Sequence, residues 1–146
     1  MDNNNYRVRR LEKGDAEAIL RWRYDSPYDF YNPPENIDAN YYVRQFLDPE
    51  LMFHAIVDST DNFIGFCSYG ADGQVSGGNY IEQALDVGLG MKPELTGQGR
   101  GVIFFRTILE YGEALSSGSL RLSVATFNCR AISLYNQFGF EEVEQF

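Results

Sequence analysis

The chain has 146 residues, 44% of them hydrophobic and 23% charged, and its 21 acidic and 12 basic residues give a formal net charge of −9. This length predicts one domain, residues 1–146, with a full core. No apolar run reaches the roughly 18 residues of a membrane span, and Met1–Asn5 is too polar for a secretory signal. Nucleic acid is not an expected partner, because its binding relies on Lys and Arg to neutralise phosphates. Two cysteines without C-x-x-C spacing predict a cytoplasmic location.

The first third of the chain predicts one strand and two helices. Tyr6–Leu11 has the pattern of a strand, and Asp15 is expected to cap the helix that follows, with Ile19 on its apolar face. A loop rich in proline and aromatic residues comes next. Asp38 can then cap a second helix, which Pro49 ends.

The middle of the chain predicts three strands. Leu51–Val57 and Phe63–Tyr69 are apolar runs joined by a short polar turn, which indicates a hairpin. Tyr80–Met91 is predicted to be a long third strand that Pro93 closes. His54 is expected to be a structural histidine, because no cluster of His and Cys accompanies it to form a metal site.

The last third predicts alternating helices and strands. Val102–Leu115 has helical periodicity, Leu120–Thr126 alternates as a strand does, and residues 131–138 return to helical spacing before Gly139. Phe140–Phe146 is predicted to begin a last strand. The order β-α-α-β-β-β-α-β-α-β predicts an α/β fold with a mixed (α+β) sheet, antiparallel early and with a crossover late.

A glycine cluster, L-T-G-Q-G-R-G over Leu95–Gly101, stands between a predicted strand and a predicted helix. Uncovered backbone amides and the positive end of a helix dipole together can hold a phosphate, although a glycine-rich turn can also be purely structural. The preceding strand contains Gly88 and Gly90, which mark a bulge or the close approach of a ligand or another backbone. A strand with an open edge that leads into an anion site suits coenzyme A, whose pantetheine amides can pair with the strand.

Two segments together resemble the GNAT superfamily of acetyl-CoA-dependent N-acetyltransferases. Pro93–Gly101 is similar to the family's pyrophosphate loop, [Q/R]-x-x-G-x-[G/A], with Thr96 at the Gln/Arg position. That departure removes a long polar side chain but keeps the backbone amides. Asn128–Phe140 matches the family's N-x-x-A-x-x-L-Y-x-x-x-G-F motif at every fixed position.

The resemblance implies an enzyme that transfers acetyl from acetyl-CoA to a primary amine of a small molecule or peptide by direct attack, with no metal. The alternative is an acyl-CoA-binding module without turnover. In the family, backbone groups before the loop pair with pantetheine, loop amides hold the pyrophosphate, and the asparagine contacts the cofactor arm. The cofactor-binding residues implied in this way are Leu89, Met91, Gly97, Gln98, Gly99, Arg100, Gly101, Val102 and Asn128.

The resemblance makes Tyr135 the general acid, close to the thioester sulfur. A phenol with a pKa of about 10 is matched to a thiolate whose conjugate acid has a pKa of roughly 8.5–10. The other interpretation is a core aromatic residue at helical spacing. For the base, the family indicates a carboxylate on the glycine-bearing strand, often acting through water. Glu82 and Asp86 are the candidates, about 13 Å apart at strand rise, and Asp86 is preferred because it lies nearer the glycine cluster.

The acceptor side has two further indications in the sequence. Tyr28, Phe30 and Tyr31 occupy the loop that commonly walls the acceptor pocket in the family, although they can equally be a cluster that covers the loop. Residues 24–95 hold twelve acidic and two basic residues, which favours a cationic amine as substrate. Family members normally close with a sixth and a seventh strand, whereas this sequence stops at Phe146, inside the predicted sixth. We therefore expect a truncated chain, or a sheet edge that another chain covers, as in a homodimer.

Overall fold

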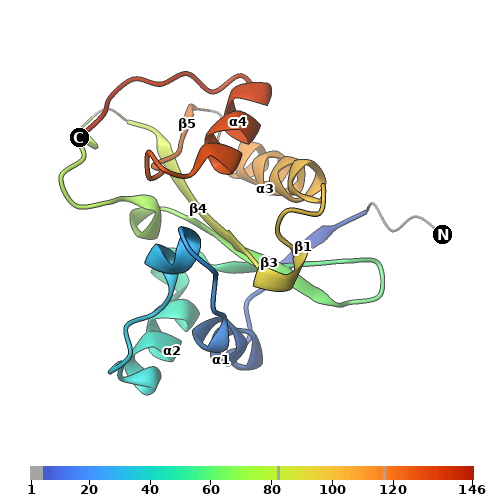
Figure 1. Ribbon diagram of the computed structural model, residues 1–146. Coiled ribbons are helices and arrows are strands. Elements are labelled where there is room, and N and C mark those ends of the chain that lie inside the picture. The colour runs from blue at the N-terminus through green and yellow to red at the C-terminus, as the bar shows by residue number, and fades with distance from the viewer. Residues whose placement is uncertain (1–4, 82, 117) are drawn as a thin grey trace.

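The computed structural model describes residues 5–81, 83–116 and 118–146, and it contains a five-stranded mixed sheet with helices on both faces (Figure 1). The strands are β1 (Arg7–Arg10), β2 (His54–Val57), β3 (Phe63–Tyr69), β4 (Leu85–Met91) and β5 (Leu120–Arg121). The helices are α1 (Lys13–Arg21), α2 (Ala39–Leu47), α3 (Gly101–Leu115) and α4 (Cys129–Gln137). Short 3₁₀ helices are η1 (Tyr28–Tyr31), η2 (Pro49–Leu51), η3 (Ala71–Gly73) and η4 (Pro93–Leu95). The α/β class with a mixed sheet is confirmed.

The sheet has the order β1-β2-β3-β4-β5, so neighbours in space are also neighbours in sequence. The first four strands are antiparallel, and α3 carries the chain across to β5, which lies parallel to β4. This last pairing covers only Leu85 with Leu120 and Asp86 with Arg121. Because β4 continues to Met91, most of its second edge lies beyond the ladder. This divergence of β4 and β5 is the feature that positions the site.

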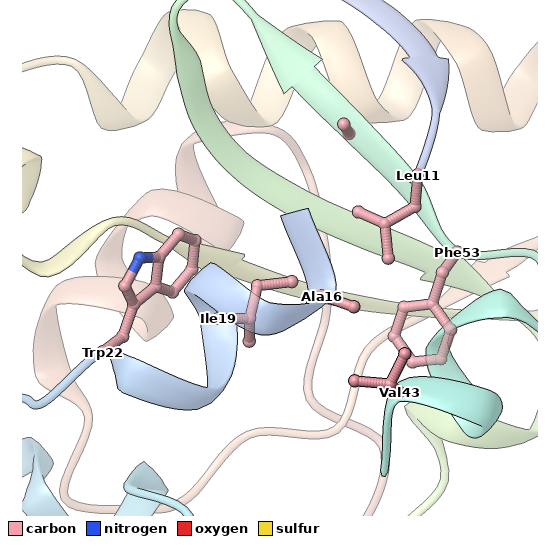
Figure 2. Packing of buried hydrophobic residues seen from close by; sticks show 7 residues of the cluster. Leu11, Ala16, Ile19, Trp22, Val43 and Phe53 are labelled. Atoms are coloured by element: carbon pink, nitrogen blue, oxygen red, sulfur yellow. The ribbon is translucent and has the colours of Figure 1, made fainter. Parts of the chain in front are cut away.

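Each face of the sheet is covered by its own apolar cluster. On one face, Figure 2 shows Leu11, Ala16, Ile19, Trp22, Val43 and Phe53 meeting between α1, α2 and the strands. On the other face, α3 buries Phe104 and Ile108 against Val87 of β4. In Figure 1, α3 and α4 lie on one side of the sheet and α1 and α2 on the other. None of the helices in the part of the chain described here is long and apolar enough to cross a membrane.

The start of α1 differs from the expectation. Asp15 was expected to be the cap, but the helix begins at Lys13 and its N-cap is Glu12. Asp15 is the third helical residue, and its carboxylate accepts a hydrogen bond from Glu12 N at 2.8 Å. Arg9 of β1 donates two further bonds to the same carboxylate, at 2.7 and 3.0 Å. Glu12 and Asp15 thus form a capping box, a local pattern that places the boundary at Glu12, and the ion pair with Arg9 holds the same carboxylate from β1.

Three predicted strands are shorter or absent. β4 begins at Leu85 rather than Tyr80, and β5 ends at Arg121 rather than Thr126. The predicted last strand, 140–146, is wrong: these residues have no regular structure and run from α4 past β5 toward the segment before β4 (Figure 1). A strand needs a partner for its backbone groups. Beyond the end of β5, the chain makes side-chain contacts instead, such as the 2.8 Å hydrogen bond between Ser123 Oγ and Tyr80 Oη from the segment before β4.

Candidate active site

The hydrogen bonds of β4 show which of its backbone groups face the open edge. Leu85 N donates to the Ser119 carbonyl on the β5 side, whereas Lys92 N donates to β3. Because the direction of backbone groups alternates along a strand, those of Leu89 and Met91 face the same side as those of Leu85. No strand among the described residues pairs with them there. The backbone groups of Leu89 and Met91, which were expected to pair with pantetheine, therefore both face the open edge of β4.

The Met91 carbonyl already accepts a hydrogen bond. Tyr24 Oη, from the segment after α1, donates to it at 2.6 Å. Burial, and then the nearby charge of Glu94, raises the pKa of Tyr24 to about 12, so the phenol stays neutral and remains a donor. A pantetheine amide that approaches Met91 must therefore use the second lone pair of this oxygen or displace Tyr24. The sequence offered no signal for this contact.

The glycine loop has the conformation that an anion site requires. Gly97 and Gly99 have φ values of +73° and +76°, in the left-handed region that side chains disfavour. The chain then enters α3 at Gly101, and Arg100 at the N-cap makes no side-chain hydrogen bond to the helix. The first backbone amides of α3, including that of Val102, have no capping side chain and lie at the positive end of the helix dipole. The sequence-based expectation of an open cradle fits this geometry.

Two side chains of the glycine loop donate hydrogen bonds to the short helix η4 that precedes it. Gln98 Nε2 donates to the Glu94 carbonyl at 2.6 Å, and Thr96 Oγ1 donates to the Pro93 carbonyl at 2.7 Å. Both bonds link the loop to η4. Thr96, which replaces the family's longer polar residue, thus closes the turn.

The first turn of α4 contacts both the aromatic loop and the glycine loop. Asn128 caps α4 through Oδ1, and its Nδ2 donates to Tyr31 Oη at 3.2 Å. Arg130 Nε donates to Tyr28 Oη at 3.0 Å, and the guanidinium carbon lies 4.1 Å from the centre of that ring. Another nitrogen of Arg130 lies 3.0 Å from the point where a Cβ on Gly97 would be. Arg130, which sequence reasoning missed, therefore brings a positive charge to the predicted phosphate site.

An exposed aromatic cluster surrounds Phe127, just before α4. Its ring centre lies 6.2 Å from that of Tyr28, 5.7 Å from Phe30 and 5.8 Å from Tyr31. The three aromatic residues singled out from the sequence thus meet at one place, and Phe127 joins them as a residue that the sequence did not indicate. Phe30 is 73% exposed, so much of its surface is open to a ligand.

Tyr135 lies on α4 with its ring 4.8 Å from that of Phe105 on α3. Burial, and next the neighbouring Tyr31, raises the pKa of the Tyr135 phenol above its usual value. The phenol is therefore neutral at physiological pH, which is the form that can donate a proton. Packing against the core and a proton-donating role are compatible here.

Asp86 is buried in an ion pair with Arg121. Nε and Nη2 of Arg121 donate to its two oxygens at 2.5 and 2.9 Å, and Gln74 Nε2 donates at 2.9 Å. Burial alone would raise the pKa of Asp86, but the hydrogen bonds from Arg121 and Gln74 together hold it below the usual value. A carboxylate held in this way is a weak proton acceptor. Glu82, the other candidate base, lies outside the described residues.

His54 has a partner on each ring nitrogen, as expected of a structural histidine. Nδ1 lies 2.8 Å from the Met52 carbonyl and Nε2 lies 3.3 Å from Tyr111 Oη. Within the described residues, no group of three or more His, Cys, Asp or Glu side chains is arranged to hold a metal ion.

The open edge of β4 and the glycine turn into α3 agree with a comparison of the sequence with family models. The acetyltransferase (GNAT) family matches over residues 16–140, and the chain belongs to this family. It is an acyltransferase that transfers acetyl to an amine, and the family uses acetyl-CoA as co-substrate. The expected N-acetyltransferase activity is thereby confirmed at the level of the family.

Solved structures show the same fold. A chimera of the spermidine N-acetyltransferase SpeG from Vibrio cholerae and hSSAT has a TM-score of 0.72 at 24% identity, covering 95% of this chain and 82% of that one. A dodecameric spermidine N-acetyltransferase from Vibrio cholerae has a TM-score of 0.67 at 23% identity, covering 97% and 82%. A GNAT-family acetyltransferase from Bacillus anthracis has a TM-score of 0.67 at 14% identity, covering 92% and 78%. No curated protein matched the sequence.

Proposed function

We propose that this enzyme acetylates a primary amine of a cationic small molecule of the polyamine class. The observation that carries the proposal is the open edge of β4, which leads through left-handed Gly97 and Gly99 into the uncapped start of α3. An extended ligand with amides at one end and phosphates at the other fits that succession of backbone groups. The polyamine class is supported by structural neighbours that are spermidine N-acetyltransferases.

The cofactor is assigned to groups along this path. Backbone groups of Leu89 and Met91 pair with the pantetheine amides, and the amides from Gly97 to Val102 bind the pyrophosphate. Arg130 adds a positive charge beside Gly97. Asn128 reaches the cofactor arm with the same side-chain amide that donates to Tyr31.

Tyr135 is assigned as the general acid. Acetyl-CoA supplies the acetyl thioester, and its sulfur leaves as a thiolate when the amine attacks. The neutral Tyr135 phenol gives its proton to that sulfur. The phenol is protonated over the physiological range, as a proton donor must be, but its raised pKa makes it a weaker acid than the matched phenol expected from the sequence.

The aromatic cluster around Phe127 is assigned to the acceptor. Ring faces attract ammonium groups, each contributing about 0.5–2 kcal/mol. Tyr28, Phe30 and Tyr31 together with Phe127 offer such faces close to the start of α4. The acidic balance of residues 24–95 favours the same charge on the substrate.

The test is acetyl-CoA turnover followed by detection of free thiol. The acceptors are spermidine, spermine, aminoglycosides, amino acids and peptides with free N-termini, each paired with a control in which the amine is already acetylated. We expect thiol release with the polyamines and one added acetyl group in the product by mass spectrometry. Binding of acetyl-CoA in calorimetry with no thiol release for any acceptor would instead support a binding module without turnover.

We also propose a homodimer. The outer edge of β5 is the end of the sheet among the described residues, and an open edge is a template for pairing with another chain. One structural neighbour is described as dodecameric, which supports self-association. Light scattering at micromolar concentration tests this, and a monomer mass would contradict it.

A further inference from the structure

Asp72 lies on η3, which packs directly on the backbone of β4. A Cβ on Gly73 would lie 3.0–3.2 Å from backbone atoms of Asp86, Val87 and Gly88, so the short helix touches the strand there. Asp72 Oδ2 lies 3.5 Å from the point where a Cβ on Gly88 would be. The missing side chain of Gly88 therefore leaves this carboxylate beside the strand.

The position of Gly88 in β4 places Asp72 beside the part of the strand that has an open edge. Gly88 stands between Val87 and Leu89, whose backbone groups face the open edge. Val87 packs into the α3 cluster, so the side-chain position of Gly88 points to the opposite face of the sheet. Tyr135 approaches from the α3 face, where it packs on Phe105. Asp72 thus lies on the face of the sheet opposite to Tyr135, beside the part of β4 that continues past its ladder with β5.

We propose that Asp72 is the general base of the reaction and accepts the proton of the attacking amine, directly or through one water. Ser68 Oγ donates to Asp72 Oδ2 at 3.4 Å, a long bond that leaves acceptor capacity. Asp86, the acidic residue that β4 brings to the same face, has its oxygens occupied by Arg121 and Gln74. Of these two carboxylates, Asp72 is the better proton acceptor.

The surroundings of Asp72 also favour proton uptake. Although much of the residue is exposed, the carboxylate is turned inward, and burial raises its pKa above the usual value despite the bond from Ser68. Among the described residues, the ion pair of Asp86 and Arg121 lies on the same side of β4. A base becomes more effective as its pKa rises toward the working pH, provided that it stays ionised.

The step balances in atoms and charge. The amine nitrogen forms a bond to the thioester carbonyl carbon, and the bond from that carbon to sulfur breaks. Asp72 receives the proton that the nitrogen loses, and the departing thiolate takes a proton from Tyr135. Solvent then removes the proton from Asp72 and restores that of Tyr135. This role rests on the proposed acetyl transfer to an amine.

The test compares Asp72→Asn and Asp72→Ala with Glu110→Gln, a neutralisation on the exposed side of α3. General-base catalysis contributes about 10²–10⁴-fold, so we expect kcat to fall by about 100-fold or more in both Asp72 variants. The acetyl-CoA Kd and Tm should stay unchanged, and Glu110→Gln should behave as the wild type. In the wild type, kcat/KM should fall as the pH falls through the pKa of the base. This acidic limb of the pH profile should disappear in Asp72→Asn.

Chemical rescue distinguishes a catalytic role of Asp72 from a structural one. Formate added to Asp72→Ala should restore part of kcat, because it supplies the missing carboxylate, and it should not affect an Asp86→Asn variant. An Asp72→Asn enzyme with kcat within threefold of the wild type, or with the acidic limb retained, would overturn the role of Asp72 alone. A wild-type protein that releases no thiol with any amine would overturn the proposed function together with this role.

Discussion

Removal of the Arg121 side chain is expected to lower stability more than that of any surface arginine. The Arg121→Met variant leaves the 5%-exposed Asp86 side chain without the guanidinium that donates to both of its oxygens. Breaking a buried pair by removing one partner typically costs about 3–5 kcal/mol, because the remaining charge is desolvated and uncompensated. The stack of Arg121 on Tyr80, at 4.9 Å, is lost as well, at a cost of about 0.5–1 kcal/mol. Since Gln74 still donates to Asp86, we expect a loss of about 4 kcal/mol.

The assay is urea unfolding of the wild type, Arg121→Met and the control Arg7→Met. Arg7 pairs with Asp61 at the surface, where the two side chains are 55% and 70% exposed. Such a pair contributes at most about 1 kcal/mol, so the control should stay near the wild type. A change below about 1 kcal/mol for Arg121→Met would refute the view that this pair joins β4 and β5.

Lowering the pH should reduce the difference in unfolding free energy between the wild type and Arg121→Met. The pKa of Asp86 is lowered in the folded state, so its pair stabilises fully above the unfolded value of about 3.9, and that stability is lost as the pH falls through the folded pKa. In Arg121→Met the unpaired carboxylate should protonate more readily. The gap in unfolding free energy between wild type and variant should therefore narrow below about pH 4. A gap that stays constant down to pH 3 would contradict this cause.

Three further predictions concern ligand binding and turnover. Tyr135→Phe should lower kcat by about 10²-fold or more with the acetyl-CoA Kd unchanged, and a kcat equal to the wild type would exclude Tyr135 as the acid. Gly99→Val should lower acetyl-CoA affinity by about 5- to 30-fold in calorimetry, because a β-branched residue at φ +76° strains the turn by about 1–2 kcal/mol. The site around Gly99 is open, so unfolding should stay cooperative, and retained affinity would place the phosphates elsewhere. Arg130→Met should weaken acetyl-CoA binding and make it less sensitive to salt, whereas an unchanged salt dependence would show that Arg130 contacts no phosphate.

The order of the elements up to α4 and the glycine turn between β4 and α3 could be predicted from the chain alone. Hydrophobic periodicity reports on burial within one element, and the cluster around Gly97 and Gly99 reports on local backbone conformation. Both are properties of residues that lie close together in the sequence, so they can be recognised without knowledge of the fold. The alternation of β4 also follows from local sequence, and it places Val87 and Leu89 on the face opposite to Asp86.

Contacts between residues that are distant in sequence decided the environments of Asp86 and Arg130. The expected role of Asp86 rested on its place along the strand, but its partner Arg121 lies 35 residues later and engages it as a structural ion pair. Arg130 meets Tyr28 across 102 positions, so no local pattern could join the aromatic loop to the glycine loop.

The acidity of the chain was visible at once as a net charge of −9, but the sequence could not say which carboxylates are available. Composition and motifs by themselves determined an acidic α/β protein of the GNAT acetyltransferase family, because they depend on residue type and short spacing. The tertiary structure decided that Asp86 is paired while Asp72 lies beside Gly88. The availability of a carboxylate depends on desolvation and on its partners in space, and folding brings those partners from remote parts of the chain.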